Sequence, residues 1–178
     1  MTKLMNNRIA ILATDGFEEI ELTAPRDELR AHGVKVDIVS DKPVIKSWKH
    51  RDWGSEFSSD RLLDRADAAE YDALILPGGV VNPDLLRRNK KSVDFIRAFS
   101  EQNKMIAAIC HGPQMLIEAD LVKDRKLTSF YSIRKDLINA GAHWKDEPVV
   151  VDGNLVTSRN PDDIPSFMKK IFDKLKVE

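Results

Sequence analysis

The feature that most constrains the fold is a repeated alternation of short apolar runs with segments of helical periodicity. The runs are too short for helices and carry many β-branched residues, which predicts strands at 8–14, 34–40, 71–79 and 105–109. Apolar residues recur at helical spacing in the segments that follow, at 18–32, 83–88, 91–102 and 113–119. Strands that alternate with helices predict an α/β domain with a mostly parallel central sheet.

The remaining segments complete one domain, which we expect to span 1–178 with a core at about 8–175. Residues 41–60 are polar with scattered aromatics and predict a small excursion or hairpin. Pro25 predicts a break or restart in the first helix. The other predictions are a short strand at 126–130, a helix at 132–141, a hairpin around Asp152-Gly153 in 148–159, and an amphipathic helix at 162–178.

Composition narrows the possible partners and the compartment. The formal net charge is −1, so the chain has no basic field that would attract nucleic acid or an anionic membrane. A single cysteine cannot form an internal disulfide, and no stretch is apolar over the length of a membrane span. The expected compartment is therefore the reducing cytoplasm, where a thiol survives.

Three of the predicted strand ends carry residues that are unusual for loops. They are the segments 15–18 (Asp-Gly-Phe-Glu), 77–79 (Pro-Gly-Gly) and 110–112 (Cys-His-Gly). In an open α/β sheet, ligands bind beyond the carboxyl ends of the strands. If the strands are parallel, these three loops meet at one edge of the sheet and form the expected site.

Cys110 lies at the turn from a strand into a helix, where the helix dipole favours a thiolate. A strained turn of this kind presents the nucleophile in many hydrolases, and the N–H of the next residue, His111, then points into an oxyanion hole. Gly78 and Gly79 would let a second N–H approach the same place. The alternatives are a buried packing cysteine, a surface histidine and, for Glu18, an ordinary first-turn carboxylate.

Other kinds of site have little support in the sequence. No His or Cys stands at metal-ligand spacing from His32, His50 or His143, and neither GxxxxGK[ST] nor GxGxxG occurs. We therefore expect no metal and no cofactor.

Several segments together resemble the PfpI-type intracellular cysteine protease/amidase family. The segments are AAICHGPQML, DGFEEIEL, DALILPGG, LINAG and VVVDGNLVTSR, and the resemblance covers roughly residues 8–175. Relatives in that family include the Parkinson-associated protein deglycases and stress-induced chaperones, in the class I glutamine amidotransferase-like superfamily. The resemblance implies a flavodoxin-like three-layer sandwich and a homodimer or larger homo-oligomer.

The resemblance also implies roles for individual residues. Cys110 matches the family's nucleophile and His111 the histidine that follows it, while the N–H groups of Gly79 and His111 match the oxyanion hole. Glu18 matches the carboxyl that hydrogen-bonds the sulfur. Asp84 stands where protease-like relatives have a glutamate that reaches the histidine of a neighbouring subunit, and it is one methylene shorter. Phe130 replaces a histidine or tyrosine of the relatives, with Tyr131 beside it.

The function that follows is a cysteine-dependent hydrolase, in which Cys110 attacks a carbonyl and His111 exchanges protons. The expected substrates are peptide or amide bonds, or reactive carbonyls in a glyoxalase- or deglycase-like reaction of stress protection. The alternative is a non-enzymatic redox sensor or chaperone-type stress protein that uses Cys110.

Overall fold

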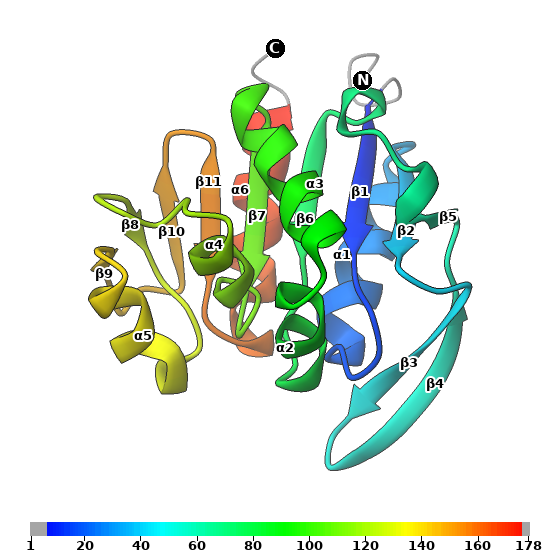
Figure 1. Cartoon of the computed structure of the whole chain (residues 1–178), viewed down its shortest axis with the longest axis horizontal. Helices are drawn as coiled ribbons and strands as arrows, with labels where there is room; N and C mark the ends of the chain where they lie inside the picture. Colours follow the sequence, from blue (N-terminus) through cyan, green and yellow to red (C-terminus); the bar gives the residue numbers. More distant parts are fainter. Residues whose placement is uncertain (1–6, 176–178) are drawn as a thin grey trace.

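A computed structural model of the chain describes residues 7–175, and its centre is a seven-stranded sheet (Figure 1). In spatial order the strands are β10 (Val149–Asp152), β11 (Leu155–Ser158), β7 (Met105–Ile109), β6 (Ala73–Leu76), β1 (Arg8–Leu12), β2 (Lys35–Ser40) and β5 (Arg61–Leu62). Every neighbouring pair is parallel except β10 with β11. The predicted α/β architecture with a mostly parallel sheet is therefore confirmed.

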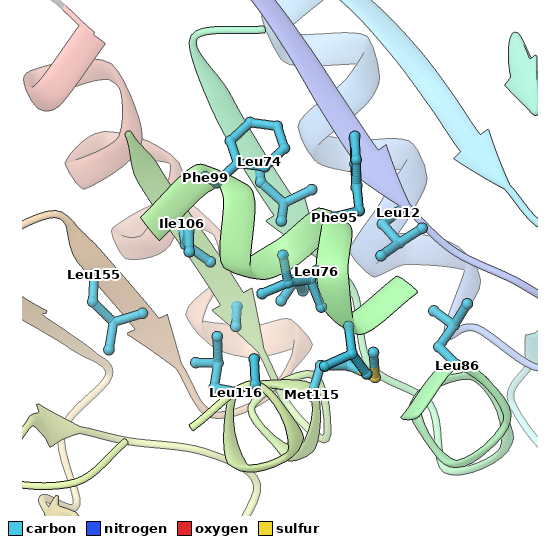
Figure 2. Packing of buried hydrophobic residues seen from close by; sticks show 14 of the residues in the cluster. Leu12, Leu74, Leu76, Leu86, Phe95, Phe99, Ile106, Met115, Leu116 and Leu155 are labelled. Atoms are coloured by element: carbon cyan, nitrogen blue, oxygen red, sulfur yellow. The ribbon is translucent and has the colours of Figure 1, made fainter. Parts of the chain in front are cut away.

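Helices cover both faces of the sheet and give three layers (Figure 1). One face packs against α1 (Glu19–Ala31) and α6 (Ile164–Leu175), and the other against α2 (Val81–Arg87), α3 (Lys90–Glu101) and α4 (Gln114–Glu118). Side chains alternate across a strand, so Ile9 and Ile11 of β1 join the first core while Leu12 joins the second. Figure 2 shows the second core, where Phe95 and Phe99 of α3 lie over the sheet.

Both predicted hairpins are present. β10 and β11 are antiparallel and turn at Asp152-Gly153, as the sequence predicts. Residues 41–60 form the antiparallel pair β3 (Val44–Lys49) and β4 (Asp52–Ser58), which lies apart from the main sheet beside the carboxyl end of β1 (Figure 1). This excursion supplies one wall of the site described below.

Some boundaries differ from the sequence-based expectations. Helix α1 runs unbroken through Pro25, whose ring is buried against the core, so packing outweighs the lost backbone hydrogen bond. The strand predicted at 126–130 shortens to β8 (Lys126–Leu127), which pairs with β9 (His143–Trp144) outside the main sheet. A 3₁₀ turn at Tyr131–Ile133 precedes α5 (Arg134–Asn139), where a single helix was expected. The end of the predicted last helix, 176–178, lies outside the described residues.

The order of strands brings the three unusual loops together. β1, β6 and β7 are neighbours at the centre of the sheet, and all three run in the same direction. Their carboxyl ends therefore lie at one edge, where the loops that begin at Ala13, Pro77 and Cys110 meet. The site expected from the sequence stands at this edge.

Candidate active site

Cys110 occupies the turn from β7 toward α4 in a left-handed backbone conformation, with φ 61°. Such a conformation costs a non-glycine residue on the order of 1–3 kcal/mol, so the surroundings have to hold it. The N–H of Cys110 donates to the carbonyl of Ser158 (3.1 Å), and its carbonyl accepts from the N–H of Phe130 (2.8 Å). The residue is 7% exposed. The predicted strained elbow is therefore confirmed, and its thiol is buried where the core borders the cavity.

The glycine pair allows the end of β6 to approach the thiol. A Cβ on Gly78 would stand 2.6 Å from the Cβ of Cys110, and one on Gly79, where φ is 79°, would stand 2.2 Å from the carbonyl oxygen of Gly16. Only glycine fits at either position. The N–H groups of Gly79 and His111 lie close enough to the sulfur of Cys110 to lower the pKa of the thiol. The two expected oxyanion-hole donors thus lie beside the sulfur.

The carboxyl next to the thiol belongs to Glu21 and not, as expected, to Glu18. Glu21 is fully buried, its Oε2 accepts the N–H of Gly78 (2.7 Å), and its carboxyl lies close enough to Cys110 for each group to shift the pKa of the other. Burial raises the pKa of Glu21 to about 8. Glu18 is half-buried at the wall of the cavity, and its pKa is also raised by burial.

The phase of α1 explains this correction. Its buried face consists of Glu21, Leu22, Pro25 and Leu29, so the side chain of Glu21 enters the protein with the apolar residues. Glu18 precedes the first helical residue, and its backbone pairs with Trp48 of the β3–β4 hairpin. A carboxyl within the apolar face of a helix was the signal in the sequence that could have pointed to Glu21.

His111 contacts the thiol directly and is held on both sides. Its Nδ1 lies 3.2 Å from the sulfur of Cys110, and its Nε2 lies 2.9 Å from the hydroxyl oxygen of Ser132. The ring stacks on Phe130, with centroids 4.9 Å apart and planes 25° apart. The residue is 8% exposed, and burial lowers the pKa of its imidazole. Sequence analysis did not single out Ser132.

Burial opposes the thiolate that the helix dipole was expected to favour. It raises the pKa of Cys110 above the usual range, and the carboxyl of Glu21, when it is ionised, raises that pKa further. The N–H groups of Gly79 and His111 lower the same pKa but do not compensate. Helix α4 begins at Gln114, four residues beyond Cys110, and it is short, so its dipole acts weakly on the sulfur.

The remaining expected residues lie farther from the thiol. Asp84 is exposed on α2 and makes no described hydrogen bond to His111, so its role across a subunit interface stays a prediction. Phe130 lines the cavity and supports the imidazole, whereas Tyr131 is 68% exposed and packs against Trp144. Tyr131 therefore does not take the place of the relatives' second histidine or tyrosine in this chain.

The thiol opens into a cavity of about 380 Å³ with mostly apolar walls. The apolar side chains that line it come from four separate segments of the chain and are Trp48, Val80, Val81, Phe130 and Pro161. Its polar groups are Cys110, His111, Glu21 and Glu18. A second cavity of about 350 Å³ shares Glu18 and Pro161 with the first. An apolar cavity with a few convergent polar groups is typical of a small-molecule or side-chain binding site.

Residues 7–175 offer no support for a metal site or a membrane-spanning helix. These residues contain no group of three or more His, Cys, Asp or Glu side chains placed to hold a metal ion. None of the helices in this part of the chain has the length and apolar character that a membrane crossing requires.

Comparison with known proteins agrees with this geometry. Residues 7–174 match the DJ-1/PfpI family. The chain belongs to the DJ-1/PfpI family. The resemblance noted in the sequence motifs is thereby confirmed, together with the flavodoxin-like α/β fold of that family.

Relatives within the DJ-1/PfpI family cover almost the whole chain. YraA of Bacillus subtilis (strain 168), whose name assigns it provisionally to the cysteine proteases, is 45% identical over 97% of this chain and 100% of its own length. Protein/nucleic acid deglycase 2 of Escherichia coli (strain K12) is 46% identical over 93% of this chain and 96% of its own length.

A solved structure shows the same fold within a longer protein. It is a two-domain protein of Anabaena variabilis with DJ-1/ThiJ/PfpI-like and ferritin-like domains, with a TM-score of 0.90 and 39% identity. The match covers 96% of this chain and 48% of that one, so this chain spans about half the length of the two-domain protein.

Proposed function

We propose that this member of the DJ-1/PfpI family is a cysteine-dependent hydrolase that acts on a carbonyl carbon. The observation that carries the proposal is the strained Cys110, whose sulfur lies 3.2 Å from the imidazole Nδ1 of His111 and beside the N–H groups of Gly79 and His111. Relatives named as deglycases and as a cysteine protease support a hydrolase. The substrate is a reactive carbonyl or its protein adduct, or a peptide or amide bond.

His111 is the base that activates the thiol in this proposal. Attack by the thiol requires that its proton move to Nδ1 as the sulfur approaches the carbonyl carbon. Burial lowers the pKa of the imidazole, so His111 is neutral at physiological pH and ready to accept that proton. With an amide, the imidazolium gives the proton to the leaving amine and water then cleaves the thioester; with a free carbonyl, the proton goes to the oxygen of the hemithioacetal.

Glu21 is the residue that stabilises the negative charge that develops on sulfur. With its pKa raised to about 8, the carboxyl holds a proton at neutral pH and donates a hydrogen bond to the sulfur. Its Oε1 is buried and has no hydrogen-bond partner in the described part of the chain, so it is available for this contact. Glu18, the residue expected in this role, instead faces the incoming substrate at the cavity wall.

The oxyanion hole is the third part of the proposal. The N–H groups of Gly79 and His111 lie beside the sulfur and stabilise the oxygen of the attacked carbonyl as it becomes negative. Loss of one such donor costs about 2.7–4 kcal/mol of barrier in other enzymes. In an apolar cavity these fixed donors act in a low dielectric, where they are strongest.

Replacement of Cys110 tests the proposal. We expect Cys110→Ala and Cys110→Ser to lose at least roughly a thousandfold in turnover, both in methylglyoxal consumption and in hydrolysis of peptide amides, because the nucleophile is gone. Circular dichroism of both variants controls for folding. Turnover that persists in both assays would sink the claim that Cys110 is the nucleophile.

The alternative of a redox sensor or chaperone-type stress protein also depends on Cys110, but it does not need a base. His111→Ala separates the two, with an expected loss of about 10²- to 10⁴-fold in turnover and no change in the rate of peroxide oxidation. The low exposure of the thiol favours the hydrolase, because sensor cysteines are accessible to the oxidant. Unchanged turnover in His111→Ala would contradict the hydrolase.

A further inference from the structure

Ser132 is the one group in the described chain that hydrogen-bonds the outer nitrogen of the His111 imidazole. Its Oγ lies 2.9 Å from Nε2, while Nδ1 on the opposite side lies 3.2 Å from the sulfur. Stacking on Phe130 fixes the plane of the ring between these two contacts. Three contacts therefore determine where the ring lies, how it is rotated and which nitrogen faces the thiol.

The chain couples Ser132 to the nucleophile through a short path. The N–H of Phe130 donates to the carbonyl of Cys110 (2.8 Å), and Ser132 follows in the 3₁₀ turn Tyr131–Ile133. The elbow and the turn are thus joined by the same backbone hydrogen bond that holds the strained Cys110. Ser132 keeps its position relative to the thiol even though it lies at the surface.

The proposed role of His111 as a base determines what Ser132 has to do. Nδ1 is the nitrogen that faces the sulfur, so it has to be the unprotonated nitrogen of the neutral ring if it is to accept the thiol proton. The ring proton then resides on Nε2, and it requires an acceptor of its own in a buried place. The hydroxyl oxygen of Ser132 is that acceptor, and it remains one after Nδ1 has taken the proton from sulfur.

We infer that Ser132 is the positioning residue of His111: its hydroxyl oxygen accepts the Nε2–H within the same chain and so presents Nδ1 to the thiol as a base. This inference rests on the proposed function for its role in turnover. It differs from the expected arrangement in which Asp84 of a neighbouring copy orients the imidazole. Nε2 is already occupied within one chain, so the orientation of the ring does not require a partner.

The direct test is the tautomer and titration of His111 by long-range ¹H–¹⁵N NMR, with His111→Asn to assign the resonances. We expect the Nε2–H tautomer in the wild type, because Ser132 Oγ accepts that proton. In Ser132→Ala the pKa of His111 should fall by about half a unit to one unit, since the imidazolium loses a hydrogen bond. Ser132→Thr, which keeps the hydroxyl, should restore the wild-type value, and Ser132→Asp should raise the pKa above it.

Turnover provides the second readout. Ser132→Ala should lower kcat by roughly two- to tenfold with little change in KM, and move the acid limb of the pH profile downward with the imidazole pKa. Cys110, Glu21 and Glu18 are the other titratable groups that line this cavity, and they are identical in every Ser132 variant. Ser59→Ala, in an exposed turn before β5, controls for loss of a surface hydroxyl.

Two results would overturn the inference. One is an unchanged tautomer and pKa of His111 in Ser132→Ala. The other is an acid limb that stays in place in Ser132→Ala and moves in Asp84→Asn, which would assign the orientation to the partner's acid. The NMR readout needs no substrate, so it decides the role of Ser132 even if Cys110→Ala retains turnover and the proposed function fails.

Discussion

Three carboxyls close together in the chain have three different chemical environments, and these follow from where each side chain lies relative to α1. Glu18 borders the cavity before the helix begins, and Glu21 is buried against the thiol one turn later. Glu19 holds the β3–β4 hairpin through Ser47 (2.6 Å) and Lys49 (2.8 Å), which lowers its pKa to about 2. The sequence places all three near the site but does not say which one the helix buries.

Glu21→Gln should change how stability depends on pH. The pKa of Glu21 is about 8 in the folded protein and near 4.5 unfolded, so the folded state holds the extra proton between these values. The free energy of unfolding of the wild type therefore falls as pH rises from about 4.5 to about 8, by an amount on the order of a few kcal/mol. Glutamine cannot ionise, so this component is absent from the variant.

Urea unfolding at several pH values between 4.5 and 8.5 measures the difference, because other titrating groups contribute equally to both proteins and cancel. Glu18→Gln is the matched control: its carboxyl is half-buried, so we expect a smaller change with the same sign. Parallel stability curves for the wild type and Glu21→Gln would show that Glu21 ionises normally.

At the scale of elements, residues at strand ends are easier to predict from the sequence than residues on the buried faces of helices. Cys110, His111 and Gly79 were predicted for the site because a cysteine, a histidine and glycines at strand ends are local signals, and the parallel sheet brings them together. The position of Glu21 and the contact between Ser132 and His111 depend on helix phase and on packing between distant segments. The apolar face of the first helix held a signal for Glu21 that a prediction from strand ends does not use, whereas no local pattern indicates the contact of Ser132.

Gly79 and Gly153 both have left-handed backbones, but they differ in the space available for a Cβ. Comparing their alanine variants therefore distinguishes the cost of backbone strain from the cost of a steric clash. Gly79→Ala puts a Cβ 2.2 Å from the carbonyl oxygen of Gly16, whereas in Gly153→Ala, at the β10–β11 turn, the nearest atom is 3.8 Å away. We expect Gly153→Ala to cost roughly 1–2 kcal/mol of stability with normal turnover. Gly79→Ala should cost a further roughly 1–3 kcal/mol from overpacking and abolish turnover, because the end of β6 has to move.

Denaturant unfolding and the Cys110-dependent assay measure both effects. Equal losses of stability in the two alanine variants, with turnover retained in Gly79→Ala, would mean that the turn relaxes and that the close approach of β6 to the thiol is dispensable.

In the whole molecule, the sheet separates two cores that share strands but few side chains. Phe99 of α3 lies in the core on one face and Phe167 of α6 in the core on the other. The three-layer sandwich implied by the family resemblance predicts this division, whereas the position of the β3–β4 hairpin depends on contacts such as those of Glu19. The active-site edge adjoins both cores, because β1, β6 and β7 contribute residues to each.

The two cores should respond independently to mutation. Phe99→Leu and Phe167→Leu should each cost about 1–2 kcal/mol of unfolding free energy, by loss of ring contacts. Because the rings lie in different clusters on opposite faces, the loss of unfolding free energy in the double variant should equal the sum of the two single losses within about 0.5 kcal/mol.

Phe95 and Phe99 lie on the same face, with ring centroids 5.1 Å apart, so Phe95→Leu with Phe99→Leu is the matched pair. This pair should depart from additivity by more than about 0.5 kcal/mol. Denaturant unfolding of the six proteins measures both double-mutant cycles. Coupling between Phe99 and Phe167 as large as that between Phe95 and Phe99 would mean that the sheet transmits packing strain between its faces, and stability would then be a property of one continuous core.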